Sequence, residues 1–413
     1  MKKVLAIVII IIILSAIGFV AWLFIGEKTP GEKIEMVKNF LPFGGDVNLP
    51  PPPLITQLPP EGNGGNGTEG PIIKGQKLYQ LTQNAITGAT FKESQSFYDL
   101  DGKIRYVEKS TGHIYEIKPD GSEQSNRISN TTILKSFEVI WSFDANNLIV
   151  RYLKDENNKE VVKNFLLNLT EQGAETATSS SLGIFIPPTI REISSSPLEN
   201  KFFYLIKSGN EATGIVSSFE DNKHDQTFFI PFSEFDVFWP SRNTITFLSK
   251  PSYITDGFLY LLNLKTKSFD KILGNIKGLT YLYAPSGEKI IYSKSEVKNF
   301  STFIYDVKTD LTDSFNLKIL PEKCVWDRKT TDVIYCAVSR NIPFANYPDD
   351  WYQSLVNFSD SIWKVNITTG TTEKIHDIEP NDLDIINLFL SPNNDFLFFT
   401  NKKDLTLWSL KLK

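Results

Sequence analysis

Two cysteines are the residues best placed to react with each other. Cys324 and Cys336 flank a predicted hairpin whose turn is centred near Thr330, which puts them directly opposite one another, with Val325 opposite Tyr335. Opposed residues of an antiparallel pair have Cα atoms ~4.5–5.5 Å apart, a separation that a disulfide spans. We predict a structural disulfide. Two buried free thiols are the alternative, and two cysteines alone do not make a metal site.

Two carboxylates are the candidates for acid–base catalysis. Glu138 and Glu192 occupy near-equivalent positions on two predicted innermost strands, where they could face a central channel. A pair of carboxylates is the minimum that a glycosidase needs. Polar residues on such strands are also expected simply because water fills the channel. We therefore assign no catalytic residue and predict that the chain is not an enzyme, with a hydrolase acting on carbohydrate or peptide in the channel mouth as the alternative.

The other residues that could bind metal or phosphate form no recognisable site. An acidic cluster near the C-terminus lacks the alternating spacing of a calcium loop, and we interpret it as a solvated connection; it comprises Asp377, Glu379, Asp382 and Asp384. The three histidines fall on loops or outer strands of different repeats, at His113, His224 and His376. The sequence has no Gly-rich phosphate loop and no Gly-x-Ser-x-Gly elbow. We predict no cofactor and no metal.

Aromatic and acidic residues gather in the longest insertion, residues 339–360. Two further enlarged loops, 174–188 and 250–257, are expected on the same rim, and long loops on a rigid scaffold commonly carry binding sites. Their aromatic and acidic side chains could stack on a sugar ring or anchor a peptide. The alternative is that the aromatics form local core at the end of their own repeat. The predicted binding residues are Tyr253, Tyr347, Asp349, Asp350, Trp351 and Tyr352.

The elements that must position these residues repeat along the chain. A Pro/Gly-type turn followed by a β-branched and aromatic strand recurs at intervals of 43 to 64 residues, at Phe143, Pro197, Pro240, Pro285, Arg328 and Pro392. With an earlier copy at 101–106, this gives seven units. An aromatic residue stands seven positions after the turn in five copies, namely Tyr204, Phe247, Tyr292, Tyr335 and Phe399. The second copy has Val150 at this position, and Tyr106 is the matching aromatic of the earliest copy. Such units predict the four-stranded blades of a β-propeller, because each must bury the same face against its neighbour.

The ends of the repeat region predict how the ring closes. The last copy supplies three strands, near 386–390, 396–400 and 405–410, and one extra strand lies upstream at 77–81. We predict that this strand completes the last blade as its outermost strand, which leaves few exposed sheet edges. The fold class is therefore all-β, a seven-bladed β-propeller over residues 76–413.

The motifs Ala284-Pro285-Ser286-Gly287 and 391–395, each followed by an alternating apolar and aromatic strand, resemble the repeats of TolB-like, WD-repeat-like propellers. Dipeptidyl-peptidase propellers are similar. The resemblance covers residues 77–413 and implies the fold, since a fold alone does not fix an activity. The Trp-Asp pair of true WD repeats is missing, and so are a hydrolase domain and the domain that precedes the TolB propeller. A TolB-like partner is therefore not implied.

The N-terminal region predicts a membrane anchor and a tether. Lys2 and Lys3 precede an apolar run over residues 4–25, long enough to cross a ~30 Å hydrocarbon core. A cleaved signal peptide is the alternative, but this apolar run is longer than the apolar region of such a peptide. We therefore predict a signal anchor over 1–25, with the C-terminal domain outside the cytoplasm. Residues 26–75 are rich in Pro and Gly, and we predict that they form a disordered linker.

Composition and architecture together predict a membrane-tethered, non-catalytic module of the cell envelope. Its partner would be an envelope protein, a peptide or a glycan, and its location the cell membrane as a single-pass protein. A net charge of −5 argues against nucleic acid, because no basic surface dominates.

Overall fold

The computed structural model of the chain describes residues 77–94, 102–169, 183–221, 223–377 and 382–413, all within the compact unit Pro71–Lys413. The predicted anchor over 1–25 and the predicted linker over 26–75 lie outside these described residues. Within the described ranges, no helix is long and apolar enough to cross a membrane.

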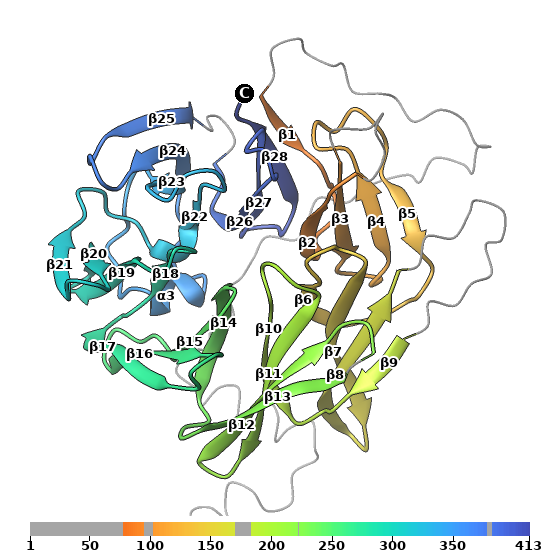
Figure 1. Cartoon of the computed structure of the whole chain (residues 1–413). Helices are drawn as coiled ribbons and strands as arrows, with labels where there is room; N and C mark the ends of the chain where they lie inside the picture. Colours follow the sequence, from red (N-terminus) through yellow and green to blue (C-terminus); the bar gives the residue numbers. More distant parts are fainter. Residues whose placement is uncertain (1–76, 95–101, 170–182, 222, 378–381) are drawn as a thin grey trace, which may run out of the picture. The chain divides into compact units, whose positions relative to one another are not determined.

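The described residues form seven four-stranded antiparallel sheets, arranged as the blades of a propeller (Figure 1). Blade 1 contains β2 (Ile86–Lys92), β3 (Lys103–Glu108), β4 (Ile114–Ile117) and β5 (Asn126–Ser129). Blade 2 contains β6 (Ser136–Trp141), β7 (Asn147–Glu156), β8 (Lys159–Asn168) and β9 (Gly183–Ile186). Blade 3 contains β10 (Ile190–Ser195), β11 (Lys201–Ser208), β12 (Glu211–Ser218) and β13 (His224–Ile230).

The next three blades repeat the pattern, with the first strand of each innermost. Blade 4 contains β14 (Phe235–Ser241), β15 (Thr244–Ser249), β16 (Asp256–Asn263) and β17 (Phe269–Lys277). Blade 5 contains β18 (Tyr281–Tyr283), β19 (Lys289–Glu296), β20 (Asn299–Asp306) and β21 (Leu311–Ser314). Blade 6 begins after the 3₁₀ turn η1 (Pro321–Lys323) and contains β22 (Cys324–Trp326), β23 (Val333–Ser339), β24 (Asp360–Asn366) and β25 (Thr372–Asp377).

Both ends of the propeller sequence build blade 7, as predicted. Its strands are β26 (Ile385–Leu390), β27 (Phe396–Asn401), β28 (Leu407–Lys411) and the upstream strand β1 (Leu78–Gln80). β1 pairs with β28 in the register Leu78↔Leu410, and the Leu81 backbone N–H donates to the Leu407 carbonyl at 2.8 Å. Figure 1 shows β1 beside β28, so the first and last strands of the ring share one sheet.

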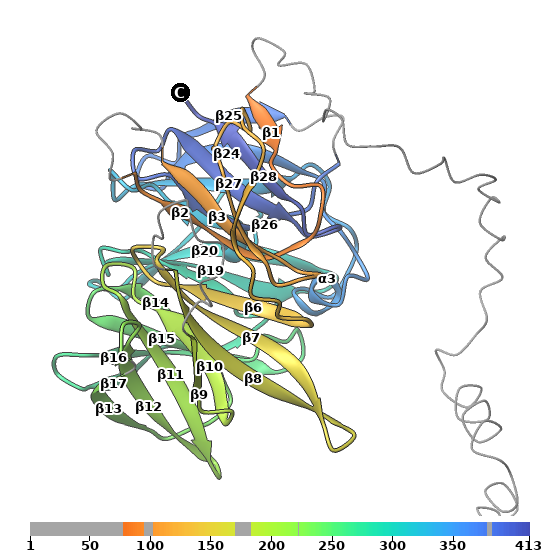
Figure 2. The ribbon, with the colours of Figure 1, turned by 90° about the vertical axis from the view of Figure 1, so that its right-hand side faces the viewer.

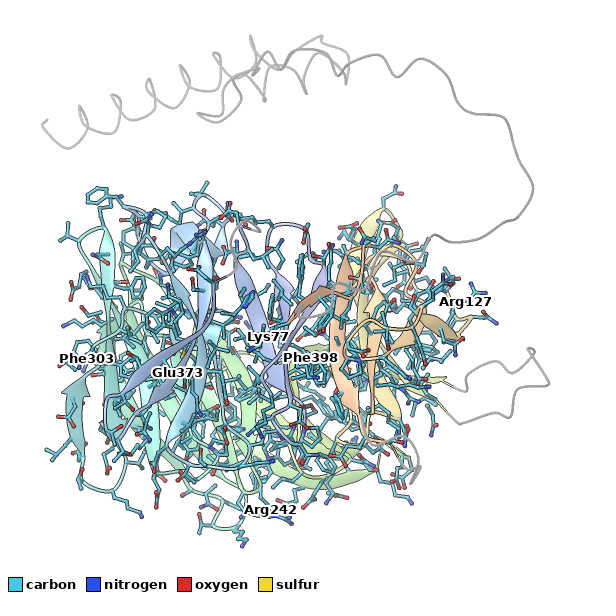
Figure 3. All side chains as sticks on the ribbon, turned by 90° about the horizontal axis from the view of Figure 1, so that it is seen from above. Lys77, Arg127, Arg242, Phe303, Glu373 and Phe398 are labelled. Carbon is cyan, nitrogen blue, oxygen red and sulfur yellow. A yellow bond between two sulfur atoms is a disulfide. The ribbon has the colours of Figure 1, made fainter. Side chains whose placement is uncertain are left out.

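The core lies between the blades, in clusters of buried apolar side chains; Phe398, labelled in Figure 3, belongs to one of them. Among the described residues, each of the seven interfaces has its own buried apolar cluster. The cluster that joins blade 7 to blade 1 packs Phe398 and Leu407 against Ile104 and Tyr106. Its presence confirms the closed ring, since a linear stack of sheets would leave that interface open.

In three blades the bulky second-strand residue that marked the repeat lies opposite an aromatic residue of the third strand. Tyr106 lies opposite Tyr115, Phe247 opposite Tyr260, and Phe399 opposite Trp408. Aromatic pairs at opposed positions stabilise a sheet, which accounts for their recurrence.

The predicted disulfide is confirmed, in the predicted register. Cys324 lies opposite Cys336 and Val325 opposite Tyr335, and the two sulfur atoms are bonded. The fourth strand of blade 5, β21, follows a tight turn at Asp310, whose φ is 59°, and ends at Ser314. Phe315 and Leu317 then pack between blades 5 and 6.

Candidate functional site

The long insertion connects β23 to β24 of blade 6, as predicted, and contains the short helix α3 (Asp349–Tyr352). Figure 2 shows α3 at one edge of the ring. The Tyr253 backbone N–H donates to Asp349 Oδ2 at 2.7 Å, so the loop between β15 and β16 contacts α3. The prediction that these two loops share a rim is therefore confirmed.

The inner side of the insertion is a small core of its own. Tyr347 and Trp351 are buried with Phe300, Leu320 and Phe358. Tyr347 donates its hydroxyl to the Pro343 carbonyl at 2.8 Å. Burial leaves neither Tyr347 nor Trp351 with a free ring face for a ligand to stack on. For these two aromatics, the structure favours the alternative of local core over a binding role.

The other predicted binding residues lie at the surface, where several of them hold the loops in place. Asp349 accepts from Tyr253 N, Asp350 Oδ2 accepts from Asn346 N at 2.7 Å, and the Tyr352 hydroxyl donates to Glu322 Oε2 at 2.7 Å. The side chains of Tyr253 and Tyr352 remain partly exposed. Of the six predicted residues, these two offer aromatic surface to a ligand.

Exposed apolar side chains of three adjacent blades lie in the insertion and in the two loops that contact it, and we call this set the apolar rim. It consists of Ile254 (64% exposed), Val297 (92%), Phe344 (81%) and Leu355 (69%), together with Tyr253 and Tyr352. The loops that carry it touch, because the Ala345 N–H donates to the Lys298 carbonyl at 3.3 Å. Sequence reasoning missed Ile254, Val297 and Leu355, since single apolar residues at loop tips carry no periodic signal.

Carboxylates from three successive inner strands lie near the starts of those strands. They are Glu138 on β6, Glu192 on β10 and Asp236 on β14. Arg151 Nη1 lies 2.5 Å from Glu138 Oε2, and Lys250 pairs with both Glu192 and Asp236. Burial raises the pKa of Glu192; the Lys250 charge opposes this effect and the charges of Asp236 and Glu138 add to it. Sequence reasoning found the two glutamates but not Asp236 or Lys250.

A fourth acid, Glu322, lies in η1, in the connection that leads into blade 6, and the charge of Asp236 acts on it. Its Oε2 accepts from Tyr352, while its Oε1 is buried and has no hydrogen-bond partner. Burial raises the pKa of Glu322 to about 7, with Lys323 opposing and the charge of Asp236 adding to the rise. A glutamate in a connection between blades stands outside every repeat position, which is why the sequence did not point to it.

The raised pKa of Glu322 predicts a pH-dependent stability. The folded chain holds this proton up to about pH 7 and the unfolded chain only to 4.5, so the free energy of unfolding falls as pH rises through this window. At about 1.4 kcal/mol per pKa unit, the loss amounts to at most about 3 kcal/mol. In Glu322→Gln this contribution to the pH dependence should disappear, as measured by denaturant titration at pH 4.5 and 7.5. The exposed Glu123→Gln is the control, and equal pH profiles for Glu322→Gln and the unaltered chain would contradict the assignment.

A buried ion cluster fastens the insertion to blades 6 and 7. Lys323 Nζ lies 2.6 Å from Asp384 Oδ1 and 2.9 Å from Asp360 Oδ2, and it donates to the Ile385 carbonyl at 2.8 Å. The Trp351 and Phe358 rings each lie 4.9 Å from the same nitrogen. The interpretation of Asp384 as part of a solvated connection is wrong, because its side chain is fully buried by this cluster.

The remaining candidates contribute no site. Asp377 and Asp382 are exposed and paired with Lys374 and Lys403, whereas Glu379 lies outside the described residues. The three histidines lie on different blades, and no group of three or more His, Cys, Asp or Glu side chains within the described ranges is arranged to hold a metal ion.

Comparisons with known proteins bear on the fold of this chain and not on its activity. No family model and no curated protein matches the sequence. Among solved structures, oligogalacturonate lyase from Vibrio parahaemolyticus has a TM-score of 0.50 and 10% identity over 81% of this chain and 93% of that one. The propeller domain of the Trilobed protease from Pyrococcus furiosus has a TM-score of 0.46 and 13% identity over 80% and 95%. TolB from Acinetobacter baumannii has a TM-score of 0.39 and 9% identity over 73% and 60%. At such identities a shared fold carries no activity with it, and the conclusion is one of architecture: the chain contains a seven-bladed β-propeller.

Proposed function

We propose that this chain is a membrane-tethered binding module that displays its propeller outside the cytoplasm and holds a protein or peptide partner on the apolar rim. The anchor and its orientation follow from Lys2, Lys3 and the apolar run over 4–25. The Pro- and Gly-rich residues 26–75 would act as the spacer between membrane and propeller.

One observation carries the proposal: exposed apolar side chains from three blades lie on loops that hydrogen bonds hold in place. Single exposed apolar residues need no explanation, whereas several large ones on loops that contact one another are typical of an interaction site. The α3 segment beneath the rim is fixed by Tyr253–Asp349 and Tyr352–Glu322 hydrogen bonds, so little ordering is needed on binding.

The composition of the rim favours a protein or peptide over a glycan. Sugars are recognised by stacking on a flat aromatic face, and the insertion's tryptophan is buried. The exposed members Ile254, Val297 and Leu355 are aliphatic and suit apolar side chains of a partner.

The rim is tested by capture of partners in intact cells. Ile254→Ser and Phe344→Ser in the full-length chain should each lower the yield of crosslinked partner by about tenfold or more, the usual effect of losing a central contact. Leu311→Ser is the matched control, because Leu311 is equally exposed but lies on the outermost strand of blade 5. Partner yields that fall equally in all three variants, or in none, would refute the apolar rim as the partner-binding surface.

These point substitutions are sharper than deletion of the insertion. A deletion of 341–358 would remove Trp351 and Phe358, which cover the buried Lys323 cluster. The propeller itself would then be destabilised, and a lost partner would not report on the surface.

The membrane orientation is a separate prediction. Alkaline phosphatase is active only outside the cytoplasm, so a fusion placed after Lys413 should be active and should sediment with membranes. Deleting residues 1–25 should abolish both properties, because that segment is the proposed anchor. An inactive fusion of the full chain would place the propeller in the cytoplasm.

A hydrolase acting in the channel mouth is the second candidate, favoured by one observation. Glu322, whose pKa is raised to about 7, could exchange a proton near neutral pH, as a general acid must. Its partner acids Glu138 and Glu192 are paired with Arg151 and Lys250 instead of standing free. Hydrolysis of a glycan or peptide by the full chain that is lost in Glu322→Gln would support this function over binding alone.

A further inference from the structure

The buried ion cluster contains an amine and a carboxyl group in contact. The side chains of Lys323 and Asp384 are 2% and 0% exposed, and Nζ lies 2.6 Å from Oδ1. The two residues are 61 positions apart in the sequence and belong to the connections that lead into blades 6 and 7. An ammonium and a carboxylate held together away from water can either remain an ion pair or condense to an amide.

We propose that Lys323 and Asp384 condense without an external enzyme to an intramolecular isopeptide bond that joins blade 6 covalently to blade 7. The proposal is independent of the partner-binding function. Holding both groups in one buried geometry replaces a collision between separate molecules, and well-oriented intramolecular reactions gain effective molarities of about 10⁵–10⁸ M.

Asp384 is placed as the electrophile. While Oδ1 contacts Lys323, its Oδ2 accepts from Trp351 Nε1 at 2.8 Å and from the Phe358 backbone N–H at 3.1 Å. When an amine attacks Cγ, negative charge develops on one carboxyl oxygen, and two fixed N–H donors at that oxygen are the arrangement that stabilises it.

Asp360 is placed as the proton carrier. Its Oδ2 lies 2.9 Å from Lys323 Nζ and also accepts from the Ile385 N–H at 2.7 Å, whereas its Oδ1 is buried with no hydrogen-bond partner. Burial raises the pKa of Asp360, with Lys323 opposing and the charge of Asp384 adding to the rise. A buried carboxyl with a free oxygen can take a proton from the ammonium and so release the neutral amine that acts as nucleophile.

The reaction balances without an oxidant or a co-reactant. Asp360 removes one proton from the Lys323 ammonium, and the neutral Nζ attacks Asp384 Cγ to form the N–C bond. Asp360 returns its proton to Asp384 Oδ1, a second proton moves from Nζ to the same oxygen, and the Cγ–Oδ1 bond breaks to release water. One hydrogen stays on the amide nitrogen, and the positive and negative charges of the pair disappear together.

Trp351 and Phe358 give the insertion a role in this step. Their rings lie 4.9 Å from Nζ on the side of the cluster covered by the insertion, and both residues also supply the donors to Oδ2. Water excluded by these rings cannot hydrolyse the product. The insertion would thus serve as the cover of the bond as well as the base of the apolar rim.

Peptide mapping of the full-length chain tests the proposal directly. After reduction of the disulfide and digestion, tandem mass spectrometry should find a branched peptide joining the Lys323 and Asp384 segments, lighter by one water than the two peptides together. Localisation is essential because a succinimide at Asp101-Gly102 also loses one water. Recovery of Lys323 as a free amine in an unbranched peptide from folded protein would overturn the proposal.

Three variants assign the roles. Lys323→Arg keeps the positive charge but lacks a primary amine and should give only unbranched peptides. Asp360→Asn should leave most Lys323 unreacted, because an amide cannot carry the proton. In Asp384→Asn a branched peptide should form with loss of ammonia in place of water. A branched peptide in Lys323→Arg would refute Lys323 as nucleophile, and full branching in Asp360→Asn would refute the proton carrier.

Discussion

Replacing Asp384 with alanine is expected to lower the free energy of unfolding by about 3–5 kcal/mol, the cost of removing one partner from a buried ion pair. Lys323 would retain only Asp360 as a carboxylate partner. The Trp351 Nε1 and Phe358 N–H donors would lose their acceptor in a site without water. If the isopeptide bond forms, the variant also loses that crosslink, so this range is a lower bound.

Asp382→Ala provides the matched control, because it removes an aspartate from the same connection. Asp382 is exposed and paired with Lys403 at 2.6 Å, and exposed pairs contribute about 0–1 kcal/mol. The comparison is made by denaturant titration of the full-length chain at pH 7. A loss below about 1 kcal/mol in Asp384→Ala would mean that water reaches the cluster and that the insertion does not seal it.

The repeat, the disulfide register and the ring closure were predictable because they depend on local pattern. Turn residues and bulky side chains recur at fixed offsets, and the register between Cys324 and Cys336 follows from counting residues across one short hairpin. The strand at 77–81 was identifiable because three strands at the other end of the repeat region left one place in the last blade unfilled.

The polar sites could be predicted only in part, because their members come from connections. Glu138 and Glu192 were found since they sit on strands at equivalent repeat positions. Lys323 and Asp384 lie outside every strand, and they are in contact although they are 61 positions apart in the sequence. An aspartate in a cluster of other acidic residues is expected to be exposed to solvent. The burial of Trp351 was one of two alternatives, and the sequence could not decide between them, because the outcome depends on how the insertion folds back toward the start of blade 7.

Deleting residues 77–82 should abolish cooperative folding of the propeller. Leu78 and Leu81 are buried in the clusters on the two sides of blade 7, and truncating one buried leucine costs about 2–5 kcal/mol. Losing both, together with the β1–β28 ladder, approaches the whole stability of about 5–15 kcal/mol of an ordinary domain. Thermal unfolding followed by circular dichroism, with size-exclusion chromatography, is the measurement, and the expected result is an aggregating chain without a sharp transition.

A control and a rescue make the role of β1 specific. Removing residues 62–67 shortens the predicted linker by the same length and should leave the transition unchanged. A synthetic peptide of residues 76–84 should restore it in the deletion variant, because β28 then offers a free edge to which a strand can add. A deletion variant that unfolds at the same midpoint as the intact chain would show that blade 7 is stable with three strands. The seventh interface, and not the shared sheet, would then be what holds the ring closed.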